Sequence, residues 1–365
     1  MSNVALFSIV AASLFALLGA FLVFDPVARR KGFTWLGLFF LLLSLNSLDA
    51  AMQFSGTYEQ FLFLILWEDP AALLYGPLIY FFVNHIRTGK AWQPSYWLHV
   101  LPFLIAETSI AFMHMHFSPQ TKEEILRIMT QRQLSYEVLI GFLPLFLHMM
   151  TYLLISQKRL AAYQNRLKHF YSGFTLSWAS RVIQLLIIIF ATSILSTLVR
   201  LSTSSLLQTG ALLAVLLVSI ILMGQVLLKA LRQPVFQEQS VREPVTRLAE
   251  NEALRLQTEL DHHLQTEKSY RRAELTLKDV AHALGTDTRS LSYIINQRIG
   301  KNFYDYVNDF RIEDAKRIFS ASNDEKLTVL EVMYQVGFNS KSSFNTQFKK
   351  KTGLTPSEYR KQHKG

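Results

Sequence analysis

Long apolar segments fill the first two thirds of the chain, whereas polar residues dominate the last third. Residues 1–24 contain no charged side chain, and further apolar segments recur at about 34–54, 70–87, 96–117, 134–156, 178–200 and 206–230. A helix of about 20 residues crosses a hydrocarbon core of about 30 Å, so each segment is of a length that spans a bilayer. The pattern predicts a bundle of seven transmembrane helices in residues 1–232.

The ends of these segments refine the prediction. The first segment lacks the positively charged beginning and the small-residue cleavage site of a signal peptide, so we expect it to remain as the first span. A shorter apolar run, Phe61–Leu66, is followed by Glu68, Asp69 and Pro70 and suits a short external helix at the membrane surface.

One pattern occurs twice between Thr276 and Arg360, first at an offset of 52 positions and then, after a one-residue slip, at 53. Each copy contains an N-capping threonine, an acidic residue three positions later, a glycine and a further capping residue: Thr276, Asp279, Gly285 and Asp287 in the first, and Thr328, Glu331, Gly337 and Asn339 in the second. Threonine and an acidic residue at this spacing form a capping box, and glycine tolerates the left-handed backbone where a helix ends. The repeat predicts two helix-turn-helix units in an all-α domain, residues 271–365.

The second copy, Val336–Arg360, resembles the second helix-turn-helix of AraC/XylS-type transcription regulators. It carries the pattern G-F-x-x-x-S-x-F-x-x-x-F-K-K-x-x-G-x-T-P-x-x-Y-R, and Val280–Phe303 is similar to the first unit of that family. The resemblance covers the last quarter of the chain. It implies that the domain binds specific double-stranded DNA, with the second helix of each unit in one of two successive major grooves about 34 Å apart.

The residues expected to contact DNA lie on the outward side of each second helix. They are Arg289, Ser290, Tyr293 and Asn296 in the first unit, and Ser340, Lys341, Ser343, Asn345, Thr346, Lys349 and Lys350 in the second. Arginine and asparagine can make bidentate contacts with guanine and adenine, whereas the lysines suit phosphates. The family often has arginine at the positions of Tyr293 and Thr346, so its base preference does not carry over. The resemblance also marks Arg311 as a structural arginine.

Charge is distributed unevenly along the chain. Residues 271–365 contain 17 Lys and Arg against 11 Asp and Glu, and so contribute +6 of the net charge of +10, which suits a phosphate backbone. Nine basic residues flank the loops predicted inside: Arg29, Arg30, Lys31, Arg87, Lys90, Lys158, Arg159, Arg166 and Lys168. Only four lie on the outer loops: Lys122, Arg127, Arg132 and Arg200. Because positive residues favour the inner side, we expect a multi-pass protein of the inner (cytoplasmic) membrane with its N-terminus outside and its C-terminal domain in the cytoplasm.

Residues 233–270 form a polar linker, within which residues 245–268 predict an amphipathic helix. Its apolar stripe falls near a 3.6-residue period: Val245, Leu248, Ala249, Ala253, Leu256, Leu260 and Leu264. Two interpretations remain open. The helix packs on its own DNA-binding domain, or it is a short stalk through which two copies form a homodimer.

Ionisable residues inside the predicted spans are candidates for a site that senses an unknown small ligand or membrane signal, since burying them in lipid is costly. They are Asp49, Glu107, His148 and Arg200. The alternative is that they form buried polar pairs that fix helix packing. The run Met113–His116 suits copper by ligand type, but alternate residues of a helix point to different sides, so we expect no metal site there.

No motif for catalysis is present, neither a Walker loop nor G-x-S-x-G nor H-E-x-x-H, and cysteine is absent. We therefore expect neither an enzyme nor a cofactor. The reading that accounts for both halves is a membrane-tethered transcription regulator that binds DNA in response to a signal sensed by the spans. One alternative is a transporter or channel whose basic tail is regulatory or degenerate. Another is an intramembrane enzyme that uses Glu107 and the histidines, which only scattered residues support. The first reading predicts that residues 234–365 alone bind DNA.

Overall fold

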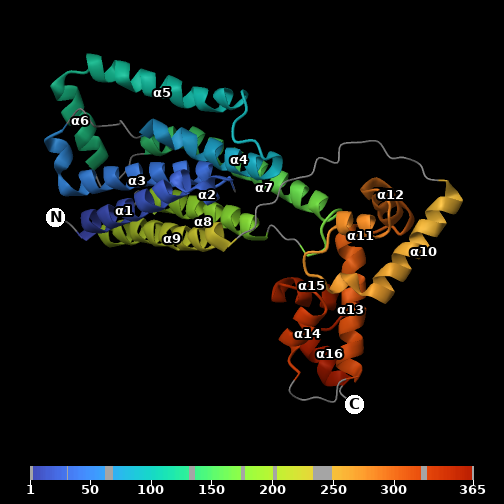
Figure 1. The fold of residues 1–365 in the computed structure, drawn as a ribbon. Coiled ribbons are helices and arrows are strands. Elements are labelled where there is room, and N and C mark those ends of the chain that lie inside the picture. Colours follow the sequence, from blue (N-terminus) through green and yellow to red (C-terminus); the bar gives the residue numbers. More distant parts are fainter. Residues whose placement is uncertain are drawn as a thin grey trace. The chain divides into compact units, whose positions relative to one another are not determined.

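The computed structural model describes residues 3–30, 32–61, 69–130, 136–173, 177–199, 204–232, 249–321 and 327–363 (Figure 1). All regular elements in these ranges are helical, which confirms the all-α prediction. The chain divides into two compact units: residues 1–161 with 177–239, and residues 162–176 with 240–365. This division differs from the predicted domains, because the second unit includes both the linker helix and a segment that precedes the sixth predicted span.

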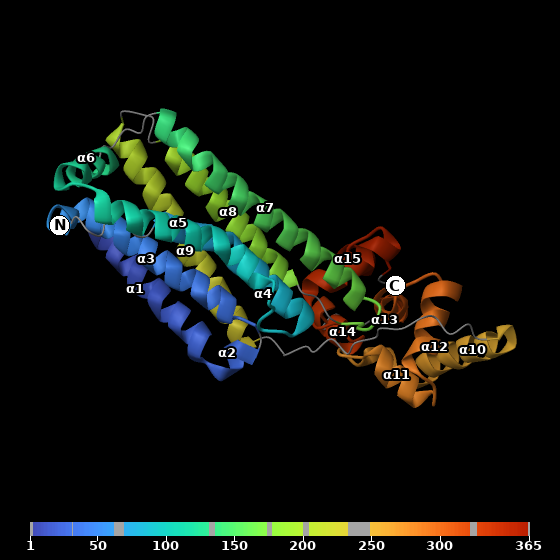
Figure 2. The same cartoon turned by 90° about the horizontal axis from the view of Figure 1, so that it is seen from above.

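The first unit is built from long helices that run side by side (Figure 2). They are α1 (Asn3–Phe24), α2 (Pro26–Arg30), α3 (Thr34–Ser55), α4 (Ala72–Thr88), α5 (Tyr96–His116), α6 (Pro119–Thr130), α7 (Tyr136–Leu167), α8 (Ser177–Val199) and α9 (Ser205–Arg232). Short 3-10 turns lie at Thr57–Glu59 and Asp69–Ala71. α1 packs on α3 and α9, α3 on α4, and α8 on α9.

Five of these helices are long and apolar enough to cross a membrane: Val4–Phe24, Thr34–Ser55, Tyr96–His116, Ala179–Val199 and Leu206–Val226. Large apolar side chains stand exposed on them, with Leu98 at 72% and Leu206 at 81% exposure, as lipid-facing residues would. The other two predicted spans correspond to α4, which has 17 residues, and to the first part of α7. The count of seven stays a prediction. Most of the predicted external helix, Phe61–Leu66, lies outside the described residues.

α1 and α3 approach each other closely at a pair of glycines. A Cβ atom on Gly19 would lie 2.9 Å from the carbonyl oxygen of Gly37, and one on Gly37 would lie 2.9 Å from the carbonyl oxygen of Gly19. The hydroxyl of Ser44 donates to the carbonyl of Ala12 across the same pair at 2.8 Å. Small residues and interhelical hydrogen bonds of this kind are what hold helices together in lipid.

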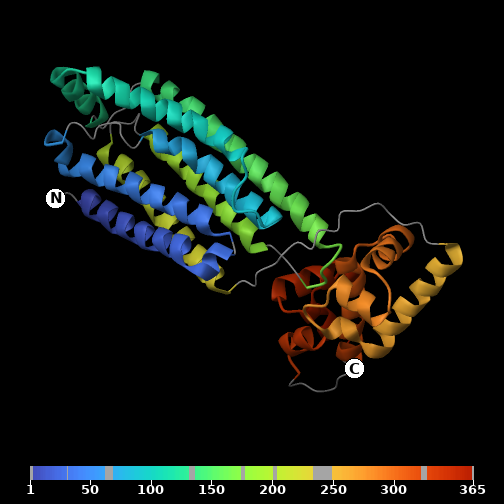
Figure 3. The same ribbon diagram turned by 45° about the horizontal axis from the view of Figure 1, so that its top comes forward.

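The second unit contains the predicted repeat (Figure 3). Its helices are α10 (Glu250–Glu267), α11 (Leu277–Ala283), α12 (Thr288–Tyr293), α13 (Phe303–Ala321), α14 (Val329–Gln335), α15 (Lys341–Thr352) and α16 (Pro356–Gln362). A 3-10 turn, Ser269–Arg271, precedes α11, and a π-helical turn, Ile294–Arg298, extends α12. α11 with α12 and α14 with α15 are the two helix-turn-helix units, and α13 is the long helix expected between them.

The predicted caps are present at both unit starts. Thr276 with Asp279 and Thr328 with Glu331 each form a complete capping box. Gly285 (φ 63°) and Gly337 (φ 94°) both have the left-handed backbone expected where the first helices end. Asp287 caps α12 as predicted, accepting hydrogen bonds from the backbone N–H of Arg289 and Ser290. The prediction for the second unit is wrong by one residue, since Ser340 and not Asn339 caps α15.

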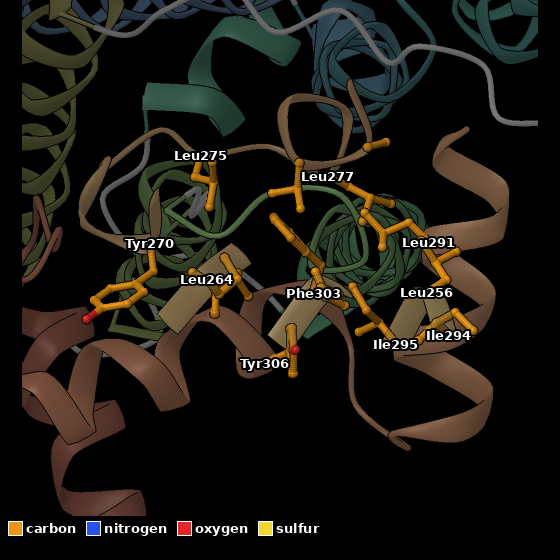
Figure 4. Close-up of a cluster of buried hydrophobic side chains, with 14 of the residues drawn as sticks. Leu256, Leu264, Tyr270, Leu275, Leu277, Leu291, Ile294, Ile295, Phe303 and Tyr306 are labelled. Carbon is orange, nitrogen blue, oxygen red and sulfur yellow. The ribbon is translucent and has the colours of Figure 1, made fainter. Parts of the chain in front are cut away.

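The stripe of α10 is buried within the second unit. Ala253, Leu256, Leu260 and Leu264 join one core with Leu291, Ile294 and Ile295 of the first helix-turn-helix and Phe303 of α13 (Figure 4). A second core lies between α13 and the second helix-turn-helix. The interpretation that this helix packs on its own domain is therefore what the structure shows for these four residues, which are not free to form a dimerisation stalk. Ala249, the N-cap of α10, is exposed. Val245 and Leu248 lie outside the described residues.

Candidate nucleic-acid interface

We call the second helix of each helix-turn-helix unit its recognition helix. The first recognition helix is α12 with its π-helical turn, and only some of its four predicted DNA-contacting residues face outward. Arg289 is exposed, and Tyr293 is half-buried against the core. The outward placement of Ser290 is wrong. Its side chain is only 7% exposed and its hydroxyl donates to Asp287 Oδ2 at 2.7 Å. That bond, with the backbone N–H donors, lowers the pKa of Asp287 below its ordinary value, so the cap stays ionised at neutral pH.

The fourth residue, Asn296, is engaged at both ends of its amide. Its Nδ2 donates to the carbonyl oxygen and to Oγ of Ser292, at 2.8 and 2.9 Å. Its Oδ1 lies 2.7 Å from Nδ1 of His169, a residue 127 positions earlier in the chain. An asparagine needs both ends of its amide to pair bidentately with adenine. In this conformation Asn296 is not available for that contact.

The second recognition helix, α15, presents its polar residues as expected. Phe344 and Phe348 are fully buried and anchor the helix on the second core. Lys341, Thr346, Lys349 and Lys350 are exposed, and Ser343 and Asn345 are half-buried on the same helix. Ser340 is occupied as the N-cap, its hydroxyl accepting from the backbone N–H of Ser343 at 3.4 Å.

Ion pairs tie the end of α15 to α13. Lys350 lies 3.3 Å from Asp305, and Lys351 lies 2.9 Å from Asp309, which also bonds Lys301. Exposed pairs of this kind contribute about 0–1 kcal/mol, so Lys350 can exchange its carboxylate for a phosphate at little cost.

A buried arginine organises the middle of the domain. Arg311 is fully buried and donates to the carbonyl oxygens of Tyr270 (2.6 Å), Arg272 (2.8 Å) and Ser172 (3.0 Å). It also donates hydrogen bonds to Asn308 Oδ1 and Ser172 Oγ, each at 3.1 Å. Burial lowers the pKa of Arg311 to about 10, so the guanidinium remains charged at neutral pH. The residue is structural, as the family resemblance implied.

No hydrogen bond or ion pair joins the three intramembrane candidates that the structure describes. Asp49, near the end of α3, accepts a hydrogen bond from the hydroxyl of Tyr58. Glu107 is half-buried on α5, and His148 lies on α7. Arg200 lies outside the described residues.

His148 instead adjoins a set of polar and aromatic side chains that sequence reasoning missed. We call Tyr80, His99, His148, Tyr152 and Arg159 the polar aromatic cluster. His99 Nδ1 lies 2.6 Å from the Tyr152 hydroxyl, and the ring centroids of His148 and Tyr152 are 4.9 Å apart. Arg159 donates to the Tyr80 hydroxyl at 2.6 Å and lies over its ring. The cluster joins side chains of α4, α5 and α7, so the spacing of residues along one helix does not predict it.

No group of three or more His, Asp or Glu side chains is placed to hold a metal ion in the ranges that the structure describes. His116, one of the residues considered for copper, has its Nδ1 2.8 Å from the carbonyl oxygen of Phe112.

Comparisons with known proteins concern the C-terminal region. Residues 280–362 match the family described as "Helix-turn-helix domain". An HTH-type transcriptional regulator in the cgkA 5' region of Pseudoalteromonas carrageenovora is 32% identical over 91 residues, which is 24% of this chain and 50% of that protein. The HTH-type transcriptional regulator YisR of Bacillus subtilis is 34% identical over 86 residues, 24% of this chain and 29% of that protein. The chain thus spans half or less of the length of these relatives.

Among solved structures, the C-terminal domain of the response regulator yesN from Fusobacterium nucleatum is 29% identical. The match covers 29% of this chain and 98% of that one, with a TM-score of 0.26. The repeated capped helix pairs, the family match and the relatives agree on one identification. The C-terminal region of this chain is an AraC-like helix-turn-helix domain of the kind found in transcription regulators.

Proposed function

We propose that the chain is a membrane-tethered transcription regulator, which binds specific DNA through its AraC-like domain in response to a signal sensed by its membrane region. One observation carries the proposal: two helix-turn-helix units, the second with a polar, exposed recognition helix, share a chain with five helices able to cross a membrane. A regulator of this design needs no separate partner to bring the signal from the membrane to the DNA.

The proposed topology has seven spans, with the N-terminus outside and the C-terminal domain in the cytoplasm. The nine basic residues on the inner loops against four on the outer loops support this orientation. Because the natural chain has no cysteine, single cysteines can be introduced and labelled from either side of sealed vesicles. A cysteine in place of Lys122, on α6, should react from outside, and one in place of Lys90 from inside. Equal reactivity of the two, or the reverse order, would contradict the topology.

For the signal site, we propose the neighbourhood of His148 over that of Asp49, Glu107 or Arg200. Support comes from the polar aromatic cluster, where side chains of α4, α5 and α7 meet, since a ligand that altered these contacts would bear on all three helices. Glu107→Gln and Tyr152→Phe separate the candidates. We expect Tyr152→Phe to lose the response to signal and to keep DNA binding. Glu107→Gln should keep both.

The test of DNA binding uses the full chain in lipid nanodiscs and a randomised duplex library. The duplex should be long enough for two successive major grooves, about 34 Å apart. The expected result is enrichment of a defined sequence whose affinity falls steeply as salt rises, because lysines that bind phosphates release counterions. Failure to enrich any sequence at low salt would overturn the proposed function.

A further inference from the structure

Residues 168–173, which follow α7, fold as part of the DNA-binding unit. We call residues 168–173 the clamp. Three hydrogen bonds join its backbone to the backbone of the domain: Tyr304 N–H to Lys168 O at 2.9 Å, Leu277 N–H to Phe170 O at 2.9 Å, and Ser172 N–H to Leu275 O at 3.2 Å. Tyr171 and Thr276 form an antiparallel β-bridge between them. The clamp is therefore paired with the start of the first helix-turn-helix.

Side chains of the clamp complete the interior of the domain. The Ser172 hydroxyl is buried, donates to Leu275 O at 2.7 Å and accepts from Arg311. Phe170 packs on the core that contains α10 and α12. Gly173 lies so close to the domain that a Cβ atom there would be 1.9 Å from the carbonyl oxygen of Ala273. The fit is specific to this segment, because it satisfies a buried guanidinium and admits no side chain at its end.

The clamp also reaches the recognition helix. His169 occupies Oδ1 of Asn296, while Ser292 occupies Nδ2. The clamp thus covers one of the few side chains of the first unit able to read a base.

The clamp continues directly from α7, which ends at Leu167. The same helix contributes three residues of the polar aromatic cluster, the last of them Arg159, eight residues before that end. At 1.5 Å per residue the separation along the helix is about 12 Å. The last residue of the cluster and the residue before the clamp therefore belong to one continuous helix.

We propose that the clamp is a cis-acting inhibitor of the AraC-like domain: while docked it withholds Asn296 from DNA, and a signal-driven movement of α7 releases it. The inference rests on the proposed function and adds its regulation. The docked clamp is the state with low affinity for DNA, and the released clamp is the state with high affinity. The ligand of the membrane region shifts the balance because it binds one of these two states more tightly.

A reversible disulfide tests the proposal in the full chain. Tyr171 and Thr276 do not exchange hydrogen bonds with each other, and in such antiparallel pairs the Cα atoms are about 4.5 Å apart, within disulfide range. Tyr171→Cys with Thr276→Cys can be locked by oxidation and released by reduction, with no natural cysteine to interfere. Thr276→Cys alone, oxidised and reduced, controls for loss of the cap.

The readout is affinity for the duplex that wild-type protein in nanodiscs enriches. We expect the oxidised double variant to bind more weakly than its reduced form. One bidentate base contact supplies about fivefold or more, and this full difference applies when the reduced clamp is fully released. Equal or tighter binding by the oxidised form would overturn the clamp while leaving the proposed function standing. Absence of binding in every form, wild type included, would overturn the proposed function and the clamp with it.

A second pair of variants tests whether the effect runs through Asn296. His169→Ala should tighten binding in the wild-type background and leave it unchanged in the Asn296→Ala background. An equal effect of His169→Ala in both backgrounds would show that the clamp does not act through this side chain, and would overturn the mechanism proposed here. Thermal unfolding of each variant identifies any variant that fails to fold. If one does, the disulfide experiment alone decides whether the clamp inhibits DNA binding.

Discussion

Ser172 offers the most direct test of whether the clamp is held as the structure indicates. Its hydroxyl makes one hydrogen bond to a neutral carbonyl, Leu275 O at 2.7 Å, and one to the charged guanidinium of Arg311 at 3.1 Å. Ser172→Ala removes both. A neutral bond contributes about 0.5–1.5 kcal/mol and one to a charged group about 1.5–3 kcal/mol. Both former partners keep another bond, so the lower values apply, and clamp docking should weaken by about 2 kcal/mol.

Amide hydrogen exchange measures this change locally. The N–H groups of Leu277 and Tyr304 are bonded to clamp carbonyls and are exposed when the clamp opens. A loss of about 2 kcal/mol should speed their exchange about 30-fold, if exchange occurs through that opening. The N–H of Val336, bonded to Val332 O in the second helix-turn-helix, serves as the internal control.

The matched control variant is Ser320→Ala, at an exposed position of α13. It should leave all three exchange rates unchanged. The reasoning is refuted if Ser172→Ala leaves Leu277 and Tyr304 as protected as in the wild type, or if it speeds Val336 equally, since the latter would mean that the whole domain has been destabilised.

Three further predictions follow from the second unit. Leu260→Ala, at a fully buried position of α10, should lower the free energy of unfolding of this unit by about 2–5 kcal/mol in denaturant titrations, whereas Leu254→Ala on the exposed face should change it by less than about 0.5 kcal/mol. Lys349→Ala should weaken binding to all duplexes alike and reduce the salt dependence of that binding. Arg289→Ala should reduce the preference for one base at one position by about 1–3 kcal/mol. Loss of base preference in Lys349→Ala, and uniform weakening in Arg289→Ala, would show that the two roles are reversed. Burial by itself raises the pKa of Asp309, but hydrogen bonds from two lysines outweigh it and the net pKa is lowered. The carboxylate therefore stabilises the fold above its ordinary pKa and this contribution is lost as pH falls, so between about pH 5 and pH 3 wild type should lose more stability than Asp309→Asn.

Local signals made the helical repeat predictable from sequence. Capping boxes such as Thr276 with Asp279 are closed by residues three positions apart, and glycines such as Gly285 are needed wherever a helix ends in the left-handed conformation. The same logic failed by one residue at Asn339, because the adjacent Ser340 is an equally good cap and residue type does not distinguish the two.

The contacts that sequence reasoning missed are long-range. The residues near Asn296 in the sequence do not indicate that His169 will bond its amide. The residues near Ser172 do not indicate that the buried Arg311 will contact it. Helical periodicity alone predicted that Ser290 faces outward, but its hydroxyl donates a hydrogen bond to the capping Asp287. Amphipathic spacing correctly found the stripe of α10, yet it could not say which surface covers it, since a stripe of leucines suits a domain core and a partner helix equally.

The central claim is that one chain is both in the membrane and on DNA. Crosslinking in cells, isolation of washed membranes and sequencing of the DNA bound to the full chain test it most directly. The expected result is a set of discrete bound sites that contain a shared sequence and that disappear when Lys349 and Arg289 are both replaced by alanine. Bound DNA that shows no discrete sites, or that is found only with protein outside the membrane fraction, would contradict it.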